Sequence, residues 1–402
     1  MGAEGSAGRH GVGPGVTSPA DFLAIDSLLN DEQVLLRDTV RRWVTERIVP
    51  HVGDWFEQGT FPAEMLGPEL GSLGLLGMHL EGYGCAGAEA TDYGLACMEL
   101  EAGDSGVRSF MSVQGSLAMF PIRAYGSEQQ RLQWLPTMAA GEAVGCFGLT
   151  EPDAGSDPAA MRTRARRRGP DWILSGTKMW ITNGSIADVA VVWAQTDDGV
   201  RGFVVPTDAP GFGARDIPRK LSLRASVTSE LVFEDVRLPA DAVLPGVVGM
   251  RGPLSCLNEA RFGILFGAVG AARSCYEAAL SYSAGRNAFG GPISRFQLTQ
   301  QKLVEMMIAV QRGTLLALHL GRLRDAGRLS AAQISVGKLD NVRMALDVAR
   351  TARGVLGANG ITLEYPVVRH MNNLESVYTY EGTHEIHTLI LGQALTGQSA
   401  FT

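Results

Sequence analysis

The chain has 402 residues, 45% of them hydrophobic and 19% charged, so it can bury a large core and is not disordered. A formal net charge of −7 argues against a general nucleic-acid partner, although a local arginine cluster can still bind a small anion. The five cysteines lack CxxC spacing, which predicts a reducing compartment with neither a disulfide framework nor a zinc site.

The N-terminal residues 1–18 are rich in Gly, Ser and Ala and contain a single arginine, Arg9. They lack the apolar core of a secretory signal, so we expect a flexible tail. The longest clean apolar run, Ile264 to Ala272, is much shorter than the roughly 20 residues that span a bilayer. The sequence therefore predicts a cytoplasmic protein without a membrane span.

The first folded zone, residues 19–145, has a helical pattern. Asn30 and Gln33 have the spacing of a capping box at the start of a helix, and Pro50 is expected to end that helix. A further helical stretch runs from Thr91 to Ala102. We expect an N-terminal helical domain.

The middle zone, residues 146–250, contains short apolar strands. Turn signals such as Asn183-Gly184 and Asp197-Asp198-Gly199 separate them. Strands and helices do not alternate here, so a dinucleotide-binding βαβ fold is disfavoured. We expect a compact β domain of antiparallel meander type.

The last zone, residues 251–402, is helical again. Leu303, Met306 and Val310 follow helical spacing, and Ser330 with Gln333 is typical of another capping box. Several long amphipathic helices in succession predict an up-and-down bundle. The fold class is therefore mainly α with a central β domain.

Near the end of the chain, Tyr380-Glu381-Gly382 places a carboxylate on a glycine-containing break just before a helical run. A glutamate that faces an apolar cleft from such a break has a raised pKa and can act as a general base. His384 and His387 share one helical face, but no third ligand accompanies them, so we predict no metal site.

The order of these zones and several motifs resemble the acyl-CoA dehydrogenase family over nearly the whole chain after the tail. The segments Cys146 to Pro152 and Trp180 to Asn183 resemble the two flavin-contact segments of that family. Glu381 falls on the catalytic base of its largest branch. The resemblance implies FAD as cofactor, a middle domain of β-barrel or sandwich type and a C-terminal four-helix bundle.

In this family an arginine that matches Arg286 reaches the FAD pyrophosphate of a neighbouring subunit, and a planar guanidinium suits that group. The resemblance therefore implies at least a dimer and, from the family alone, a homotetramer. The positions that it assigns to FAD are Phe147, Leu149, Thr150, Ser156, Trp180, Ile181, Thr182, Arg286, Phe289, Gln297, Gly354, Leu356, Gly357, Ala358 and Thr383.

Within the family, the runs Asp104 to Gln114 and Cys256 to Arg261 closely resemble glutaryl-CoA dehydrogenases. There the arginine that matches Arg108 binds the distal carboxylate of the substrate, next to a serine and a glutamate. From the residues alone, a surface ion pair of Arg108 with Glu101 or Asp104 is favoured, because exposed ion pairs are common. The positions that the resemblance assigns to substrate are Glu101, Arg108, Ser109, Ser112, Ser156, Thr182, Asn258, Arg261, Tyr380, Gly382 and Phe401.

The resemblance implies FAD-dependent oxidative decarboxylation of glutaryl-CoA to crotonyl-CoA and CO2, with electrons passed to an electron-transfer flavoprotein. Val107 and Phe110 depart from the pattern of that subfamily. An alternative therefore stays open: dehydrogenation of another short-chain or dicarboxylyl thioester, on CoA or a carrier protein, without decarboxylation. A helical scaffold that has lost catalysis would lack the base, which Glu381 supplies.

Overall fold

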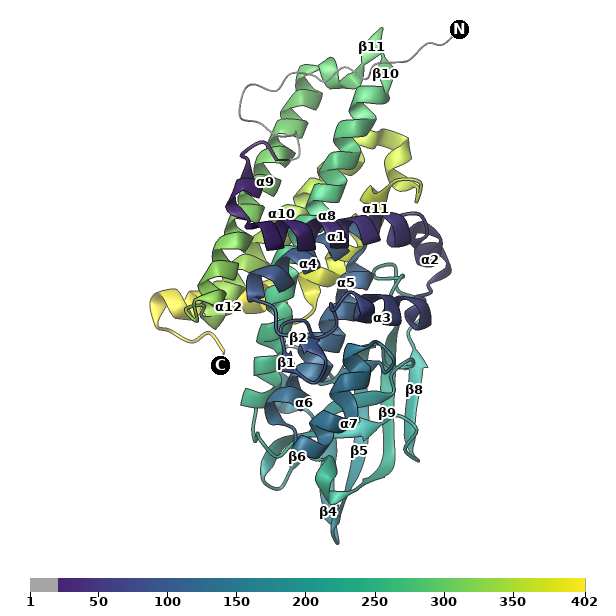
Figure 1. Ribbon diagram of the computed structural model, residues 1–402, viewed down its shortest axis with the longest axis vertical. Coiled ribbons are helices and arrows are strands. Elements are labelled where there is room, and N and C mark those ends of the chain that lie inside the picture. The colour runs from purple at the N-terminus through teal and green to yellow at the C-terminus, as the bar shows by residue number, and fades with distance from the viewer. Residues whose placement is uncertain (1–20, 402) are drawn as a thin grey trace.

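The structure is a computed structural model that describes residues 21–401, so the predicted tail at residues 1–18 lies outside it. Helices form the N-terminal and C-terminal parts, and a curled seven-stranded sheet lies between them in the chain (Figure 1). This confirms the predicted fold class. The domain boundaries at residues 145/146 and 250/251 stay a prediction.

The N-terminal helices begin with the predicted capping box. Gln33 N donates to Asn30 Oδ1 at 2.8 Å, and Asn30 N donates back to Gln33 Oε1 at 3.3 Å. Two π-helical segments, Val44–Ile48 and Val113–Met119, continue the first and fifth helices. The helices of this part are α1 (Asp31–Trp43), α2 (Val52–Gln58), α3 (Ala63–Ser72), α4 (Ala90–Gly103), α5 (Ser105–Ser112), α6 (Phe120–Tyr125) and α7 (Glu128–Ala139), with a small hairpin of β1 (Glu81–Gly82) and β2 (Cys85–Ala86).

The middle sheet is mixed, which corrects the expectation of an antiparallel meander. Its order is β3-β6-β4-β5-β9-β8, with β7 paired to β6, and both β3 and β4 run parallel to β6. A long connection after β3, residues 149–163, lets the chain return in the same direction, as parallel pairing requires. The strands are β3 (Gly145–Gly148), β4 (Arg164–Arg168), β5 (Asp171–Thr182), β6 (Val189–Thr196), β7 (Gly199–Pro206), β8 (Phe212–Asp216) and β9 (Thr228–Leu238).

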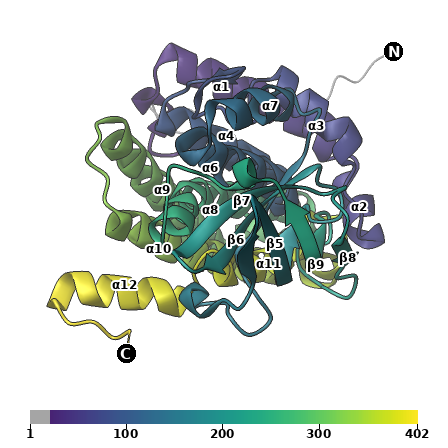
Figure 2. The same cartoon turned by 90° about the horizontal axis from the view of Figure 1, so that it is seen from below.

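The C-terminal part is built from long helices, and the second predicted capping box is present at Ser330 and Gln333. The last helix projects away from the rest of the bundle (Figure 2). The helices are α8 (Arg251–Gly285), α9 (Gln297–Asp325), α10 (Ala331–Leu356), α11 (Pro366–Thr379) and α12 (His384–Thr396), and a hairpin of β10 (Asn287–Ala288) and β11 (Gly291–Pro292) joins α8 to α9.

Helix α8 packs against α4 and α10 at the centre of the molecule. Two glycines of α8 allow its backbone to lie very close to α4. A Cβ at Gly270 would lie 1.9 Å from the carbonyl oxygen of Met98, and one at Gly267 would lie 1.9 Å from Glu101 Oε2. The bare backbone at Gly267 therefore leaves room for a buried carboxylate on α4.

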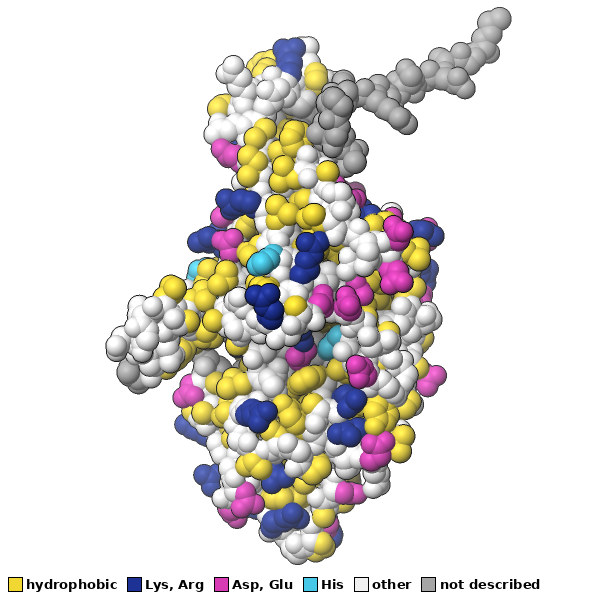
Figure 3. All heavy atoms as spheres, turned by 60° about the vertical axis from the view of Figure 1, so that its left-hand side comes forward, with side chains coloured by type: hydrophobic (Ala, Val, Ile, Leu, Met, Phe, Trp, Pro, Cys, Tyr) yellow, Lys and Arg dark blue, Asp and Glu magenta, His cyan; other side chains and the backbone are white. Residues whose placement is uncertain are grey.

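Among residues 21–401, helix α9 alone is long and apolar enough to cross a membrane, judged by length and composition only. Helix α9 packs against α8, α10 and α4, and a core helix of a bundle can have the same length and apolar composition. Apolar side chains nevertheless gather on the exposed upper part of the molecule (Figure 3). Those exposed on α9 include Leu298, Val304 and Ile308.

Candidate functional site

The loop between α11 and α12 carries Glu381 in an unusual backbone conformation. Glu381 has φ of +54° and Gly382 has φ of +96°, in the left-handed region that costs a non-glycine residue about 1–2 kcal/mol. Lys338 Nζ donates to the carbonyls of Tyr380 at 2.5 Å and Gly382 at 2.6 Å. Arg261 Nε donates to the Glu381 carbonyl at 2.7 Å. Two cations thus hold three successive carbonyls of the loop.

The surroundings of Glu381 raise the pKa of its carboxyl group. Its Oε2 atom is shut off from solvent and has no hydrogen-bond partner among residues 21–401. Burial raises the pKa of Glu381, and the positive charges of Arg108, Lys338 and Arg261 oppose that rise. A buried carboxylate with a raised pKa can take a proton from carbon.

Arg108, on α5, is only 1% exposed, and its charge acts on Glu381. Its Nε donates to Glu101 Oε2 at 2.6 Å, and its Nη2 donates to the Tyr380 hydroxyl. The ion pair with Glu101 that the sequence left open therefore exists, but it is buried rather than at the surface. Asp104 pairs with Arg369 instead.

Arg108 forms a polar patch with Glu101, Ser109 and Tyr380. Burial raises the pKa of the Tyr380 hydroxyl, whereas Arg108 and a contact with Ser109 lower it. Ser112 is buried and accepts a hydrogen bond from Tyr93 at 3.4 Å. An arginine carries five N–H donors, and the contacts with Glu101 and Tyr380 engage two of them. The remaining donors suit a bidentate carboxylate.

Phe110, which departs from the subfamily pattern, packs into the helical core. Its ring lies 5.0 Å from that of Phe61, centroid to centroid, and both belong to the large core of the N-terminal and C-terminal helices. Its bulk is therefore absorbed by packing against Phe61.

On α8, Arg261 Nη1 donates to Asn258 Oδ1 at 3.1 Å. Because Arg261 also donates to the Glu381 carbonyl, these two residues lie beside the Glu381 loop, and their assignment to substrate stays a prediction.

Strand β5 supplies a second surface. Trp180 is 58% exposed and has φ of +63°, at a register irregularity between Lys178 and Ile181. Such backbone strain costs about 1–3 kcal/mol and clusters at functional sites. Trp180 thus has an exposed aromatic face, and Thr182 ends the same strand.

The segment that resembles the first flavin contact lies along β5. Met179 N donates to the Thr150 carbonyl at 2.8 Å, and the buried Lys178 Nζ donates to the Leu149 carbonyl at 3.0 Å. The side chains of Phe147, Leu149 and Ile181 are buried in the protein, so they can offer a ligand mainly backbone groups, whereas Ser156 is exposed.

Several predicted residues lie far from Glu381 within one chain. Arg286 follows the end of α8, roughly 37 Å along the helix from Arg261, and the exposed Phe289 and Gln297 lie beside it. Phe401 is exposed beyond α12, whose length separates it from Thr383 by about 20 Å. These residues can contribute only to another part of a ligand or to a neighbouring chain.

The glycine-rich segment at the end of α10 offers an open backbone surface. Apart from their own neighbours in the chain, no atom of residues 21–401 lies within 4 Å of a Cβ added at Gly354 or Gly357. Leu356 is buried, whereas Ala358 is exposed on the short 3-10 helix that follows. A flat ligand can therefore approach this backbone closely.

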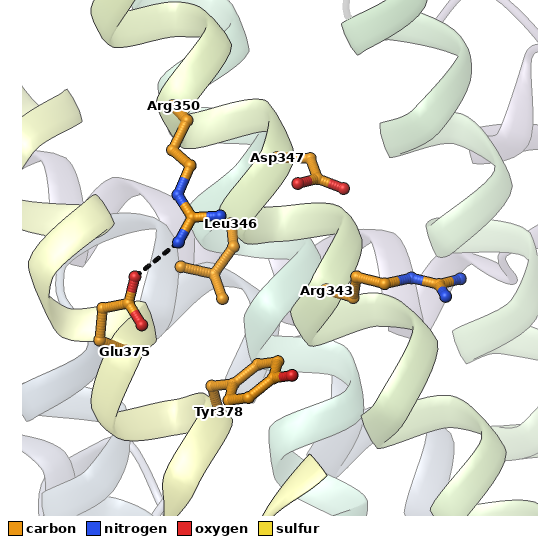
Figure 4. Close-up of a pocket in the computed structure, with 6 residues that line it drawn as sticks. All are labelled: Arg343, Leu346, Asp347, Arg350, Glu375 and Tyr378. Atoms are coloured by element: carbon orange, nitrogen blue, oxygen red, sulfur yellow. Dashed lines mark hydrogen bonds and ion pairs between the residues drawn. The ribbon is translucent and has the colours of Figure 1, made fainter. Parts of the chain in front are cut away.

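A hollow of about 320 Å³ lies between α10 and α11 (Figure 4). Its lining is mostly charged, and Arg350 forms an ion pair with Glu375 across it at 2.8 Å. Glu381 and Arg108 are not among its lining residues. The hollow is therefore distinct from the polar patch described above.

The sequence reasoning missed Lys338. It lies on α10 in the same buried stripe as Ile334 and Val342, four residues to either side, and is only 2% exposed. A lysine at a core position of an amphipathic helix could have been identified from the sequence, because a buried charge needs partners inside the protein. The Nδ1 atom of His387 lies 2.9 Å from Ser335 Oγ. Residues 21–401 contain no cluster of three potential metal ligands.

Family models match the chain in three consecutive segments. The acyl-CoA dehydrogenase N-terminal domain matches residues 30–142, the middle domain residues 146–236, and the C-terminal domain residues 248–396. The chain belongs to the acyl-CoA dehydrogenase family.

The relatives of this acyl-CoA dehydrogenase include enzymes that are named for different substrates. The mitochondrial short-chain specific acyl-CoA dehydrogenase of Bos taurus is 34% identical over 371 residues, 90% of each chain. The glutaryl-CoA dehydrogenase of Desulfococcus multivorans is also 34% identical over 382 residues, which cover 91% of this chain and 97% of the relative. These relatives alone do not separate the two substrates.

Solved structures give a closer match. A glutaryl-CoA dehydrogenase from Mycobacterium smegmatis is 65% identical, with a TM-score of 0.94, over 96% of this acyl-CoA dehydrogenase and 100% of that chain. A second structure, of a glutaryl-CoA dehydrogenase from the same organism in complex with FADH2, is 62% identical with a TM-score of 0.94, over 96% and 99% of the two chains.

Proposed function

We propose that this acyl-CoA dehydrogenase is an FAD-dependent glutaryl-CoA dehydrogenase that forms crotonyl-CoA and CO2. The proposal rests on two groups: the Glu381 carboxyl, whose buried Oε2 atom has no hydrogen-bond partner among residues 21–401, and the buried guanidinium of Arg108, which donates to the adjacent Tyr380. A base at one end and a cation at the other match a thioester that ends in a carboxylate. The 65% identity to the Mycobacterium smegmatis glutaryl-CoA dehydrogenase supports this substrate.

Glu381 is proposed to act on the α-carbon of the thioester. Hydrogen bonds to the thioester carbonyl stabilise the enolate that develops as the proton leaves, and the backbone N–H of Glu381 is one such donor in our proposal. The carboxyl group then holds this proton, and burial favours the protonated form because it raises the pKa of Glu381.

Arg108 is proposed to bind the distal carboxylate of the substrate. A substrate with a methyl end would leave this buried cation facing an apolar group, which is costly. Once the α,β-double bond has formed, the bond to the carboxylate breaks and its electron pair passes into a dienolate conjugated with the thioester. CO2 leaves, and Glu381 returns its proton to the far carbon.

The residues present fit FAD. Trp180 offers an exposed flat face, Thr150 and Thr182 offer polar groups beside it, and the backbone at Gly354 and Gly357 is open to a flat ligand. When bound, FAD accepts the β-hydride of the thioester. Arg286, Phe289 and Gln297 would hold the FAD of a neighbouring subunit, in a homotetramer that stays a prediction. An electron-transfer flavoprotein as the acceptor and a cytoplasmic location complete the proposal.

Anaerobic mixing of the yellow purified protein with glutaryl-CoA tests this function. We expect the oxidised-flavin absorbance to bleach and one CO2 to be released for each flavin reduced. Butyryl-CoA is the matched control, and it should bleach the flavin much more slowly. Faster bleaching by butyryl-CoA, or bleaching by glutaryl-CoA without CO2, would favour the alternative of a dehydrogenase that does not decarboxylate.

A further inference from the structure

Lys338 is a buried cation beside Glu381 that the proposed chemistry does not use. It belongs to α10, whereas Glu381 belongs to the loop before α12, so its two hydrogen bonds tie elements 42 and 44 residues apart in the chain. The acceptors are the carbonyls on either side of Glu381, and the ammonium also lies 5.8 Å from the centre of the Tyr380 ring. The single side chain of Lys338 therefore binds the backbone on both sides of Glu381.

We propose that Lys338 is a positioning residue for Glu381: its ammonium fixes the left-handed turn from which the carboxyl group is aimed, and its charge favours the carboxylate. This inference rests on the proposed function. The turn at Glu381 and Gly382 brings the carbonyls of Tyr380 and Gly382 onto one ammonium, and without that donor the left-handed conformation of Glu381 loses two of its restraints. A shift of about 1 Å in a catalytic group can cost a factor of about 100 in rate.

The charge of Lys338 acts on Glu381 in a defined direction. Burial lowers the pKa of Lys338, the Glu381 carboxylate raises it, and the cations Arg261 and Arg108 lower it. In return, Lys338 is one of the cations that oppose the rise in the pKa of Glu381. The titratable and charged groups around the Lys338 side chain are Arg108 on α5, Arg261 on α8, Tyr378 on α11, Tyr380 and Glu381 in the loop, and His384 and His387 on α12.

A purely structural role would make a different prediction. If Lys338 only attached the loop to α10, its removal would lower stability and leave the pH dependence of the reaction unchanged. Asn341, one turn further along α10, provides that comparison. It is fully buried and ties α10 to α8 through the Leu265 carbonyl at 2.7 Å, away from the Glu381 loop.

The test compares Lys338→Met, Lys338→Gln and Asn341→Ala with the unchanged FAD-loaded protein. Methionine keeps the length of the side chain and removes both charge and donors, whereas glutamine keeps a donor without the charge. The readouts are the rate constant of flavin bleaching by glutaryl-CoA across pH, the dissociation constant of glutaryl-CoA, and the flavin content.

For Lys338→Met we expect normal flavin content, a dissociation constant within about threefold of the unchanged protein, and bleaching at least about 100-fold slower at pH 7. The acid limb of its pH profile should move to higher pH, because a cation beside Glu381 is lost. Lys338→Gln should recover part of the rate and keep the shifted limb. Asn341→Ala should lower thermal stability and keep the original profile.

Bleaching by Lys338→Met within about twofold of the unchanged protein, with the same pH profile, would overturn the inference. So would a slower rate with an unshifted profile that Asn341→Ala reproduces. If Lys338→Met fails to fold, the shifted acid limb of Lys338→Gln decides the question. Absence of bleaching by glutaryl-CoA in the unchanged protein would instead overturn the proposed function, so the two failures are distinguishable.

Discussion

The protonation of Glu381 is governed by its surroundings rather than by a hydrogen-bond partner, since no described residue bonds to its Oε2 atom. Glu381→Gln keeps the size and shape of the side chain and removes the base. We expect this variant to stay yellow. Its flavin should bleach with glutaryl-CoA about 100- to 10,000-fold more slowly, the usual range for a lost general base. Bleaching at the unchanged rate would assign the proton transfer to another group.

The raised pKa of Glu381 also predicts the pH dependence of the unchanged protein. Only the carboxylate form takes a proton, so the bleaching rate should rise with pH through the pKa of Glu381 in the enzyme. Because burial raises that pKa, the midpoint should lie above the ordinary glutamate value of about 4.3. Stopped-flow bleaching across a pH series measures it. A midpoint at or below the ordinary value would contradict the assigned environment.

Arg108 should determine which acyl chain is accepted. Arg108→Met removes the cation, and we expect kcat/KM for glutaryl-CoA to fall by about 100- to 1,000-fold while that for butyryl-CoA changes much less. The scale follows from the about 3–5 kcal/mol that breaking a buried charge pair costs.

The variant Arg108→Met leaves Glu101 buried and unpaired, which by itself destabilises the fold. The double variant Arg108→Met with Glu101→Gln removes that complication and serves as the matched control. Comparable losses on both substrates in the double variant would exclude the role of Arg108 as a carboxylate anchor.

Glu99 connects three helices by charge. Its carboxylate accepts hydrogen bonds from Arg41 on α1 at 2.9 Å and from Arg273 on α8 at 2.6 and 2.7 Å. Burial by itself raises the pKa of Glu99, but Arg273 and Arg41 outweigh it and lower the pKa to about 2. This pairing joins α4, which carries Glu101, to the helices that cover it.

Glu99→Gln should therefore lower the free energy of unfolding by about 3 kcal/mol at pH 7. The folded pKa is below the unfolded value, so the stabilisation is complete above about pH 4.5 and is lost as the pH falls toward 2. Denaturant titrations at pH 7 and at lower pH measure this. Arg41→Gln, which removes the more exposed partner, should cost less. A difference that does not shrink with falling pH would contradict the account.

Short-range features of the fold were predictable from the sequence, and long-range ones were not. The capping boxes at Asn30 and Ser330 depend on residues three apart, so their pattern is local. The parallel pairing of β3 with β6 depends on strands about 40 residues apart, and no local pattern reports it. Arg108 and Glu381 were found by motif, but their connection through Tyr380 spans 272 residues and needed the fold.

At the scale of the whole molecule, the hairpin between α8 and α9 is ordered by its own hydrogen bonds, but its tip is exposed to solvent in the single chain. Arg295 holds it by donating to the Phe289 carbonyl at 2.8 Å and to the Gly290 carbonyl at 3.3 Å. Phe289 itself is 91% exposed, and the apolar side chains of α9 continue along the same upper part (Figure 3). An ordered hairpin with an exposed aromatic tip is typical of a surface that meets another chain.

Phe289→Glu should therefore disrupt assembly and cofactor binding together, because the hairpin also carries Arg286, which is proposed to hold the FAD of a neighbour. Analytical ultracentrifugation of the unchanged protein should show four chains of 42.8 kDa, about 171 kDa in total, with bound flavin. The variant should sediment as smaller species that have lost their yellow colour. Leu35→Glu, at an exposed apolar position on α1, should change neither property. A Phe289→Glu protein of smaller size that keeps its flavin would show that each chain holds FAD without its neighbour.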